Sequence, residues 1–538
     1  MNIPSRVNPF GYDNSLPPGY TPVDYLRSTG TQYIDTQIYN FESFILDYKS
    51  TGGSYWNNIL GHIPTGRTRR FAATSGQFVA VFHPDSYYIW ANFDINPSVR
   101  NRLEYSLAAN RSYVVNGETY SGLSAVAVNP VYDVQEVDLS VYLFACNLGT
   151  SLSYGYAAIY ECSMFDNEGV KVRDFIPVID SAGEPCMYDK VSHNTFKNVG
   201  SGSFMVGLTL EQTRNLNLPT PTAVKKLTLV LPAEAGFDYR AQKALSDNTK
   251  KGWTLTVQYD SSGIPYNIRK VEFLEGTSAM NKSYQWINTG VQMADNVGIK
   301  AKFSVDRGRF ATGVGSWAAS TDSAEFLTHV STFNIAQHHY LGYGWGIPIT
   351  PSNRLLGIRA YAIQEGELNW LNSGKAVFSA PKATLYASTT SPDKDVPVSV
   401  TYTLASPPAQ PVLNYEIYLF ALNNNGTPYM FSTAPNRQRI YEASISVDDV
   451  EHTHFVAAID RTGTPCMFDT IGSRLVENAG TGAFTVGIAT VEELRDLYIP
   501  ASPAGASLKV SVPADTPDSA IDALHTHNPN LQIAITYR

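Results

Sequence analysis

The chain has 538 residues, which corresponds to roughly 3.6 domains at about 150 residues each. Hydrophobic residues make up 43% of it and charged residues only 16%, so wholesale intrinsic disorder is excluded. Its 39 basic and 48 acidic residues give a formal net charge of −9. Because no basic excess is present to follow a phosphate backbone, we expect no nucleic-acid partner.

Residues 1–21 form an arm rich in Pro, Gly and Asn, in which the predicted anchoring residues are Pro4, Pro9, Phe10 and Tyr12. The prolines disfavour a helix or a central strand. The backbone groups of the arm therefore need partners outside this chain, or water. The arm lacks the apolar stretch of a secretory signal, and no run of about 18 apolar residues occurs anywhere. We therefore expect neither secretion through a leader nor a membrane span.

A long segment near the middle of the chain recurs 280 positions later. The matched positions are Asp180 and Asp460, Pro185 and Pro465, Cys186 and Cys466, Met187 and Met467, Asp189 and Asp469, Gly200 and Gly480, Gly202 and Gly482, Phe204 and Phe484, and Gly207 and Gly487. Further upstream, Tyr25 matches Phe273, Gln32 matches Gln285, and YLFACN matches YLFALN. The sequence is therefore a tandem duplication, which gives two large units at 22–212 and 263–497.

Both large units have the pattern of β-structure. Short runs of alternating polarity are bounded by Gly, Asn, Asp, Ser and Pro, and helical periodicity is confined to 209–216 and 490–497. Residues 166–170 have the composition of a hairpin turn, and 200–204 that of a tight turn into the last strand. Many short strands in units of this size predict two-sheet sandwiches of the jelly-roll kind.

A smaller element follows each large unit, at 213–262 and 498–538. Each has an alternating strand, a Pro-Ala turn, a short helix (residues 239–248 in the first) and a second strand, so its two strands should be parallel. About 35 residues cannot bury a sufficient core alone. The element must dock on its own sandwich or against a neighbouring chain. The predicted fold class is therefore mainly β, with two tandem jelly-roll β-sandwiches, each followed by a small β-α-β unit.

The first unit resembles a known family. The segments YLRSTGTQYIDT and IYECSMFDNEGVKVRDFIPVIDSAGEPCMYDKVSHNTFKNVGSGSFMVG are similar to concanavalin A-like, laminin-G-like lectin domains. In this form the domains occur in virion proteins of tailed phages of gut bacteria and in surface proteins of those bacteria. The resemblance covers residues 22–208. The second unit keeps Tyr441-Glu442 but reduces DNEGVKVRDFIP to DDVEHTHFVAA. The resemblance implies a lectin-like jelly roll and a virion or surface role.

Catalytic and metal-binding patterns are missing from the sequence. The nearest approach to the E-x-D-x-x-E carboxylates of jelly-roll glycosidases is Glu136 and Asp138, followed by Val141 instead of a second Glu. HExxH, G-x-S-x-G and Walker A motifs do not occur. The two HxH pairs, His452-Thr-His454 and His525-Thr-His527, each suggest two imidazoles on one strand face without a third ligand. We therefore predict no catalytic residue, metal site or cofactor, and four buried, reduced cysteines.

Aromatic and polar clustering leaves sugar binding as the candidate chemistry. Pyranose rings stack on Trp and Tyr faces, and neighbouring polar side chains bond their hydroxyls. The candidate residues are Tyr55, Trp56, His62, Tyr88 and Trp90 in the first unit and Trp317, His339, Tyr343 and Trp345 in the second. Packing in the core or between domains is the alternative explanation for these side chains.

The combined features favour a bacteriophage virion structural protein on the particle surface, as a head decoration, head fibre or tail-associated adhesin. Its expected partners are other virion proteins, bound through the arm, and host-surface or mucin glycans. It is expected to be a homo-oligomer or present in many copies, made in the host cytoplasm and released by lysis. The alternative is a secreted or surface carbohydrate-binding protein of a gut bacterium. An enzyme is a third reading, for which no residues stand out.

Overall fold

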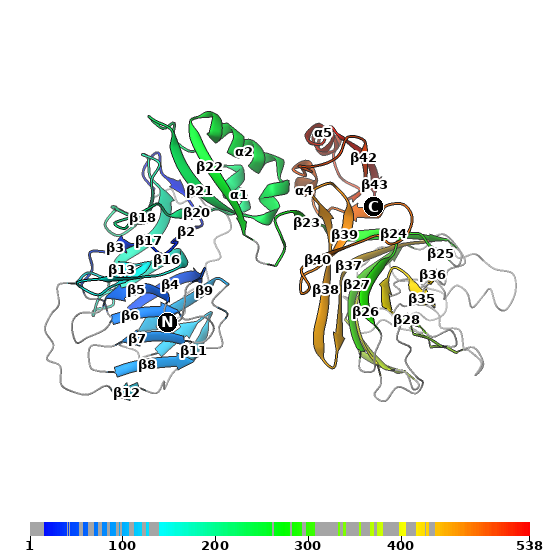
Figure 1. Ribbon diagram of the computed structural model, residues 1–538, viewed down its shortest axis with the longest axis horizontal. Coiled ribbons are helices and arrows are strands. Elements are labelled where there is room, and N and C mark those ends of the chain that lie inside the picture. Colours follow the sequence, from blue (N-terminus) through cyan, green and yellow to red (C-terminus); the bar gives the residue numbers. More distant parts are fainter. Residues whose placement is uncertain are drawn as a thin grey trace. The chain divides into compact units, whose positions relative to one another are not determined.

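Figure 1 shows the computed structural model, in which the chain forms two compact units. The first comprises Met1–Ala235 with Arg240–Asp260, and the second comprises Gly236–Tyr239 with Ser261–Arg538. The structure describes residues 16–39, 41, 43–52, 57–62, 69–73, 78–82, 87–92, 96, 99–106, 112–120, 125–127, 139–260, 263–279, 282–292, 297–306, 332–333, 337–339, 354–356, 366–370, 374–379, 398–404, 416–424, 427–429 and 436–538.

Two sheets build the first unit. The larger has the order β11-β10-β9-β4-β16-β2-β20-β21-β22, and β17 adds a branch with β1, β18 and β19. Its strands are β1 (Thr21–Pro22), β2 (Tyr25–Arg27), β4 (Ser43–Ser50), β9 (Asn101–Ser106), β10 (Ser112–Val115), β11 (Glu118–Tyr120), β16 (Ala157–Phe165), β17 (Lys171–Ile179), β18 (Pro185–Asp189), β19 (Thr195–Lys197), β20 (Met205–Gly207), β21 (Lys225–Pro232) and β22 (Trp253–Asp260).

The smaller sheet has the order β12-β8-β7-β6-β5-β13-β3, with β14 and β15 beside β5. Its strands are β3 (Ile34–Asp35), β5 (Asn57–His62), β6 (Arg69–Ala73), β7 (Phe78–Phe82), β8 (Tyr87–Asn92), β12 (Ala125–Ala127), β13 (Tyr142–Leu143), β14 (Ala145–Asn147) and β15 (Leu152–Tyr154). All the regular secondary structure described between residues 22 and 208 is β-strand, as the sequence predicts.

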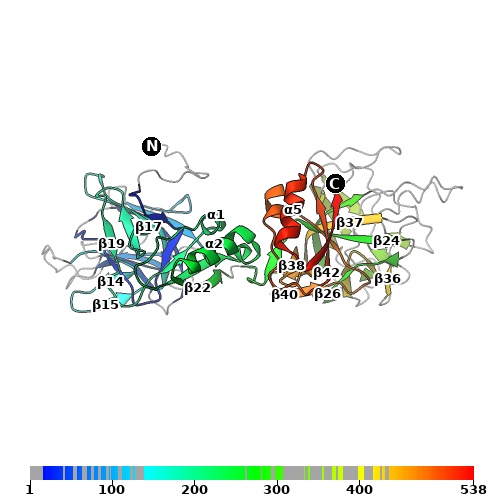
Figure 2. The same cartoon turned by 90° about the horizontal axis from the view of Figure 1, so that it is seen from above.

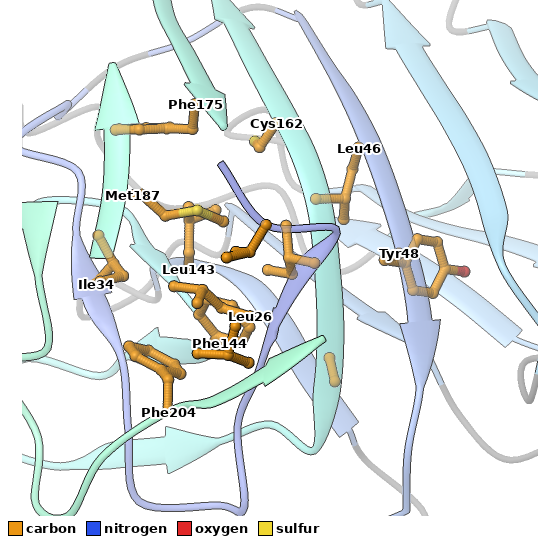
Figure 3. Packing of buried hydrophobic residues seen from close by; sticks show 14 of the residues in the cluster. Leu26, Ile34, Leu46, Tyr48, Leu143, Phe144, Cys162, Phe175, Met187 and Phe204 are labelled. Atoms are coloured by element: carbon orange, nitrogen blue, oxygen red, sulfur yellow. The ribbon is translucent and has the colours of Figure 1, made fainter. Parts of the chain in front are cut away.

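The core of the first unit is made by side chains from both sheets. Leu26 is fully buried in it, whereas its neighbour Tyr25 belongs to a separate cluster on the opposite face of the larger sheet. In Figure 3, Phe144 lies beside Phe204, and their ring centroids are 4.7 Å apart. A two-sheet sandwich with one apolar interior is therefore present, and the predicted fold class is confirmed.

The small β-α-β unit extends the larger sheet. Strand β21 pairs in parallel with β20 on one side and with β22 on the other, so the predicted parallel pairing is confirmed. Helix α2 (Tyr239–Lys250) connects β21 and β22 after a 3-10 turn, η1 (Ala233–Phe237), and lies beside β22 in Figure 2. Leu229 of β21 and Leu245 of α2 join the sandwich core. The small unit therefore docks on its own sandwich.

The second unit repeats this plan. Its large sheet has the order β31-β32-β33-β27-β37-β24-β41-β42-β43, with β25, β23, β38, β39 and β40 attached. Its strands are β23 (Ile268–Lys270), β24 (Phe273–Ala279), β25 (Lys282–Ser283), β27 (Val297–Asp306), β31 (Gly366–Trp370), β32 (Gly374–Ser379), β33 (Val398–Leu404), β37 (Asn436–Val447), β38 (Val450–Asp460), β39 (Pro465–Asp469), β40 (Arg474–Glu477), β41 (Thr485–Gly487), β42 (Ala506–Val512) and β43 (Leu531–Tyr537).

Smaller groups of strands accompany it. These are β26 (Ile287–Gln292) with β34 (Glu416–Leu419), β28 (Thr332–Phe333) with β35 (Leu422–Asn424) and β36 (Thr427–Tyr429), and β29 (Gln337–His339) with β30 (Arg354–Leu356). Strands β42 and β43 pair in parallel, with α5 (Asp518–His527) between them in sequence.

Short helices lie where the sequence predicts helical periodicity. They are α1 (Leu210–Arg214) and α4 (Val491–Arg495), and each begins with a capping box made by Thr209 or Thr490. One expectation is wrong. His525 and His527 lie in α5 and not on a strand, so residues two apart do not share a face. Within the described residues, no group of His, Cys, Asp or Glu side chains is arranged to hold a metal ion.

Most repeated polar residues have structural roles. Asp189 is fully buried and accepts hydrogen bonds from the N–H groups of Asp174, Val191 and Ser192. Asp469 accepts equivalent bonds, including one from the N–H of His454. These carboxylates close the loop after β18 or β39 and fix the strand beside it. The duplication therefore marks turns as well as any binding site.

All four cysteines are free and buried, as predicted. Burial, together with the nearby carboxylates of Asp174 and Glu161, raises the pKa of Cys162. Burial also raises the pKa of Cys186 to about 12. These thiols therefore stay protonated at neutral pH, which suits packing and not nucleophilic chemistry.

Residues 16–22 run along the first sandwich. Thr21 pairs with Ile179, and the rings of Tyr20 and Tyr188 are 6.0 Å apart. The predicted anchoring residues Pro4, Pro9, Phe10 and Tyr12 lie outside the described residues. The anchoring hypothesis therefore concerns residues 1–15.

Because the small unit shares its core with the first sandwich, a substitution in it should lower the unfolding free energy of the whole first unit. Leu229→Ala removes a fully buried side chain that the sandwich shares, so the first unit should lose about 2–5 kcal/mol of unfolding free energy. The exposed Thr256→Ala on β22 is the matched control and should change it by less than about 0.5 kcal/mol. Chemical denaturation followed by circular dichroism measures both. Equal, small effects would contradict a shared core.

Candidate functional site

The residues predicted to bind sugars are only partly located by the structure. His62 lies on β5, and Tyr88 and Trp90 lie on β8, all in the smaller sheet of the first unit, while His339 lies on β29. The side chains of these four lie outside the described residues, as do Tyr55, Trp56, Trp317, Tyr343 and Trp345 entirely. Glu136 and Asp138 lie outside them as well. The sugar-binding role of all nine stays a prediction.

A different aromatic cluster lies on the smaller sheet, and we call it the aromatic platform. It consists of Tyr33, immediately before β3, Tyr142 on β13 and Tyr154 on β15. The ring centroids of Tyr33 and Tyr142 are 4.7 Å apart, and those of Tyr33 and Tyr154 are 6.2 Å apart. All three side chains are half-buried. The platform thus presents ring surface to solvent on the face away from the core, where Leu143 points inward.

The second unit carries an aromatic pair at two matching positions, in which Trp286 is half-buried and Tyr418 is buried. Trp286 takes the place of Tyr33, and Tyr418 takes that of Tyr142. Their ring centroids are 4.3 Å apart with an interplanar angle of 35°. Strand pairing places the two alike, since Ile287 is opposite Leu419 as Ile34 is opposite Leu143.

A turn at Asn198-Val199-Gly200, called the Asn-Gly turn below, holds Tyr33, the first ring of the platform. The amide oxygen of Asn198 accepts a hydrogen bond from the N–H of Tyr33 at 3.1 Å, and its amide nitrogen donates to the carbonyl oxygen of Gly202 at 2.9 Å. A Cβ atom at Gly200 would overlap the carbonyl oxygen of Thr31 and press on the Tyr33 ring. Glycine is therefore required for the turn to lie against the platform.

The second platform ring is held in the same way. Asn478 accepts from the N–H of Trp286 at 3.0 Å and donates to the carbonyl oxygen of Gly482 at 2.8 Å. A Cβ atom at Gly480 would overlap the carbonyl oxygen of Tyr284 and the Trp286 ring. The repeated Gly and Asn residues of the sequence thus position an aromatic ring in both copies.

An unusual backbone conformation occurs two residues after Tyr142 and two residues after Tyr418. Phe144 has φ of 64°, and Phe420 has φ of 65°. Bulky residues rarely adopt this left-handed conformation. Here it turns the chain so that Phe144 packs on Phe204 while Tyr142, two residues earlier, stays on the outer face. The same backbone strain thus occurs beside the aromatic pair in both copies.

Polar groups flank the rings. Asp35 is directly opposite Tyr142 in the β3–β13 pair, and its carboxylate also accepts from the N–H of Gln37 at 2.9 Å. In the second unit the position of Asp35 is held by Asn288, whose amide donates to Glu416 at 2.7 Å. Each platform therefore has an oxygen acceptor beside its rings.

The phenols of Tyr33, Tyr142 and Tyr418 are neutral at physiological pH. Burial, with the nearby Tyr154 and Asp35, raises the pKa of Tyr33, and burial with Asp35 raises that of Tyr142. Burial and Glu416 raise the pKa of Tyr418. Neutral phenols keep their O–H donors. The platform can thus stack on an apolar ring face and exchange hydrogen bonds with hydroxyl groups, which is the chemistry that sugars require.

The sequence held the signal for this platform. YIDT and WINT are matched stretches of the duplication, as are YLFAC and YLFAL. We expected the site in stretches dense in Trp and Tyr, whereas the platform draws single aromatic residues from separate segments. Partial exposure, which a sequence does not reveal, distinguishes Tyr33, Tyr142 and Trp286 from core residues, whereas Tyr418 is buried.

No protein-family model and no curated protein matches the sequence. Among solved structures, the chain is similar to mouse laminin alpha1 chain, domains LG4-5, with 8% identity over 87% of this chain and 79% of that one, at a TM-score of 0.21. At that score the fold assignment rests on the strand order and the core described above. No helix in the described part of the chain is long and apolar enough to cross a membrane.

Loss of the Asn198 side chain should lower the unfolding free energy of the first unit. Asn198→Ala leaves the N–H of Tyr33 and the carbonyl of Gly202 without this partner, so the first unit should lose about 1–3 kcal/mol of unfolding free energy. The exposed Asn194→Ala, on the preceding loop, should change it by less than about 0.5 kcal/mol. Denaturant titration of both variants decides, and equal stability would refute the role of Asn198.

Proposed function

We propose that this protein binds glycans through its aromatic platforms and is displayed on the surface of a tailed-phage particle. The observation that carries the binding proposal is the repeated platform itself. Two sandwiches hold an aromatic pair, with an oxygen acceptor beside it, by the same Asn-Gly turn. Trp56 and Trp90 are predicted to contribute further stacking surface in the first unit.

The number of rings sets the expected affinity. An aromatic contact contributes roughly 0.5–1.5 kcal/mol, so a site with two or three rings and a few hydrogen bonds reaches a Kd of about 1 mM. Such a site is useful only when many copies act together, because linked sites raise avidity by ~10²–10⁴. Display in many copies on a particle would supply this.

The virion location is supported by the resemblance of residues 22–208 to lectin-like domains of phage particles. In this proposal residues 1–15 attach the protein to a capsid or tail protein, and lysis releases the assembled particle. The alternative, a bacterial surface or secreted carbohydrate-binding protein, would use the same platforms. The location experiment below separates the two.

Platform variants test the binding proposal. Tyr33→Ala and Trp286→Ala each remove one stacking ring and should each weaken retention on mucin or host-cell glycans by about tenfold, equivalent to ~1.4 kcal/mol. The double variant should bind least. Retention of the protein, presented in many copies on beads, on immobilised glycans measures this.

Tyr537→Ala is the matched control, because Tyr537 is exposed and lies on β43, away from the platform residues in the sequence and in the sheet order. It should leave retention unchanged. If all variants and the unmodified protein are retained alike, the platforms are structural and the glycan proposal fails.

The location proposal has its own test. Purified particles from a lysate should contain the full chain by mass spectrometry, and a chain lacking residues 1–15 should fold yet be absent from particles. Because β1 begins at Thr21, this deletion leaves the described sandwich intact. Recovery of the chain only from cell envelopes or culture medium would favour the bacterial alternative.

A further inference from the structure

A second aromatic pair lies on the larger sheet of each unit, on the face opposite the core. In the first unit it consists of Tyr25 on β2 and Tyr160 on β16, with ring centroids 5.0 Å apart. In the second it consists of Phe273 on β24 and Tyr441 on β37, at 5.3 Å. We call each pair an outer pair.

A β-bulge directs one ring of each outer pair. The register of β16 with β4 shifts between Ile159 and Glu161, and that of β37 with β27 shifts at Tyr441. A bulge places two successive side chains on one face, and bulges are over-represented next to functional sites. Tyr160 and Glu161 accordingly both leave the core face, while Cys162 returns to it.

A glycine supports the other ring. Gly207 is opposite Tyr25 in the β2–β20 pair, and Gly487 is opposite Phe273. A Cβ atom at either glycine would overlap the ring that lies over it. The outer pairs are therefore built alike in the two units.

In the second unit a guanidinium group occupies the outer pair. Arg538 lies with its Cζ atom 4.9 Å from the centroid of Phe273. Its Nη2 atom donates to the carboxylate of Glu272 and, at 2.9 Å, to the carbonyl oxygen of Ile488. A second guanidinium, that of Arg439, lies 4.7 Å from the same ring and bonds Glu275 at 2.7 Å. Phe273 is fully buried in this arrangement, and the matching Tyr25 of the first unit is 7% exposed.

The first unit has the same receptor groups. Asp24 stands where the second unit has Glu272, Tyr25 where it has Phe273, and the carbonyl of Leu208 where it has that of Ile488, because Gly207 and Gly487 match in register. The groups that fill the site differ, however. Asp260 follows Tyr259 as Arg538 follows Tyr537, and Ala158 takes the position of Arg439.

Two cations near the first outer pair, Arg100 and Lys49, are hydrogen-bonded to carboxylates other than Asp24. Arg100 donates two hydrogen bonds to Asp47, at 2.9 and 2.7 Å, and stacks 4.1 Å from the centroid of Tyr160. It reaches Asp24 only at 3.8 Å. Lys49 bonds Asp260 at 3.1 Å. Arg27, two residues after Tyr25 on β2, is a third cation near the Tyr25 ring. Three carboxylates and three cations thus surround the two tyrosines, and the 3.8 Å ion pair of Asp24 is longer than those of Asp47 and Asp260.

Asp24 has the weakest ion pair of the three carboxylates. Burial, opposed by Arg100 and assisted by Asp47, raises the pKa of Asp24 to about 6. The charged and titratable groups around the outer pair are Arg27, Asp47, Arg100, Tyr25, Tyr160, Asp260 and Lys49. A carboxylate with so high a pKa lacks a full counter-charge.

We propose that the first outer pair is a receptor site for a guanidinium group, which an arginine side chain of a partner polypeptide inserts between Asp24 and Tyr25. The second unit supplies the internal template, since its own Arg538 fills the equivalent place. This inference is independent of glycan binding, which uses the smaller sheet.

A guanidinium fits this site better than an ammonium. It is planar, so it stacks on the Tyr25 ring while its edge donates to two acceptors. The acceptors offered, the Asp24 carboxylate and the Leu208 carbonyl oxygen, are those that Nη2 of Arg538 uses in the second unit. A lysine presents a more strongly hydrated point charge with no flat face, so it should bind less well.

The full chain is titrated with N-acetyl-argininamide, and binding is followed by ligand-observed NMR. We expect saturable binding of one equivalent in the millimolar range, at least about tenfold tighter than that of the uncharged citrulline analogue or of N-acetyl-lysinamide. Asp24→Asn should lose about tenfold. An arginine-containing peptide that binds tighter than the amide identifies a polypeptide source, whereas equal binding points to a free small molecule and overturns the partner assignment.

A control and two further variants complete the test. Glu168→Gln changes an exposed carboxylate in the turn between β16 and β17 and should leave binding unchanged, which makes it the matched control for Asp24→Asn. Asp260→Arg should fill the first site with its own guanidinium and abolish binding. Arg538→Ala should open the second site and raise the stoichiometry from one to two. Folding of each variant is checked by circular dichroism.

The pH dependence follows from Asp24. Protonation below a pKa of about 6 removes the charge that attracts the ligand, so binding should weaken as the pH falls through that value. The Asp24→Asn variant should lack this dependence. Equal binding by Asp24→Asn and the unmodified chain, equal binding of the arginine and citrulline amides, or no saturable binding would each overturn the proposal.

Discussion

One close approach of the backbone governs the arrangement of each sandwich. The glycine at position 200 or 480 lies so near the carbonyl oxygen of residue 31 or 284 that no side chain fits between them. The neighbouring asparagine, Asn198 or Asn478, satisfies the amide groups that this approach exposes. A few residues later Phe204 or Phe484 enters the core. The same turn thus fixes a ring on the surface and a ring in the interior.

The two copies keep this scaffold and differ in charge. The Asn-Gly turn, the left-handed phenylalanine, the bulge and the glycine under the outer ring occur in both. Asp260 and Arg538, in contrast, hold equivalent positions with opposite charge. Ala158 of the first unit likewise corresponds to Arg439 of the second. A buried charge is stable only with a partner, so each change of sign alters which partner the surface accepts. The second unit places Arg538 against Glu272, whereas in the first unit Asp24 has a 3.8 Å ion pair with Arg100.

The sequence was sufficient for the fold because the fold depends on local constraints that repeat. Gly207, Asp189 and the parallel strands around Leu229 each follow from a pattern visible in the residues, and the structure confirms the pairing of the strands. The aromatic platform was missed, because a tyrosine in an alternating strand has the same pattern whether its ring is buried or half-exposed. Tyr33 and Tyr142 stand out only once strand pairing brings them together.

The cluster around Asp24 was beyond sequence reasoning for a different reason. Its members come from β2, β4, β16, β22 and the segments before β2 and β9. The bond between Lys49 on β4 and Asp260 on β22 joins strands that four others separate in the sheet order. At about 4.8 Å per strand a flat sheet would keep them more than 20 Å apart. The sheet must therefore curl, and no periodicity in the residues encodes that curvature.

The curl has a consequence for binding. It gathers three carboxylates and two tyrosines on the face of the larger sheet that points away from the core, while the aromatic platform lies on the outer face of the smaller sheet. The apolar core between the two faces contains Leu26, Leu143 and Phe144, all fully buried. Because no residue belongs to both sites, a sugar on one face and a guanidinium on the other need not compete. One sandwich of this kind can hold a structural partner and still present a free surface to a glycan.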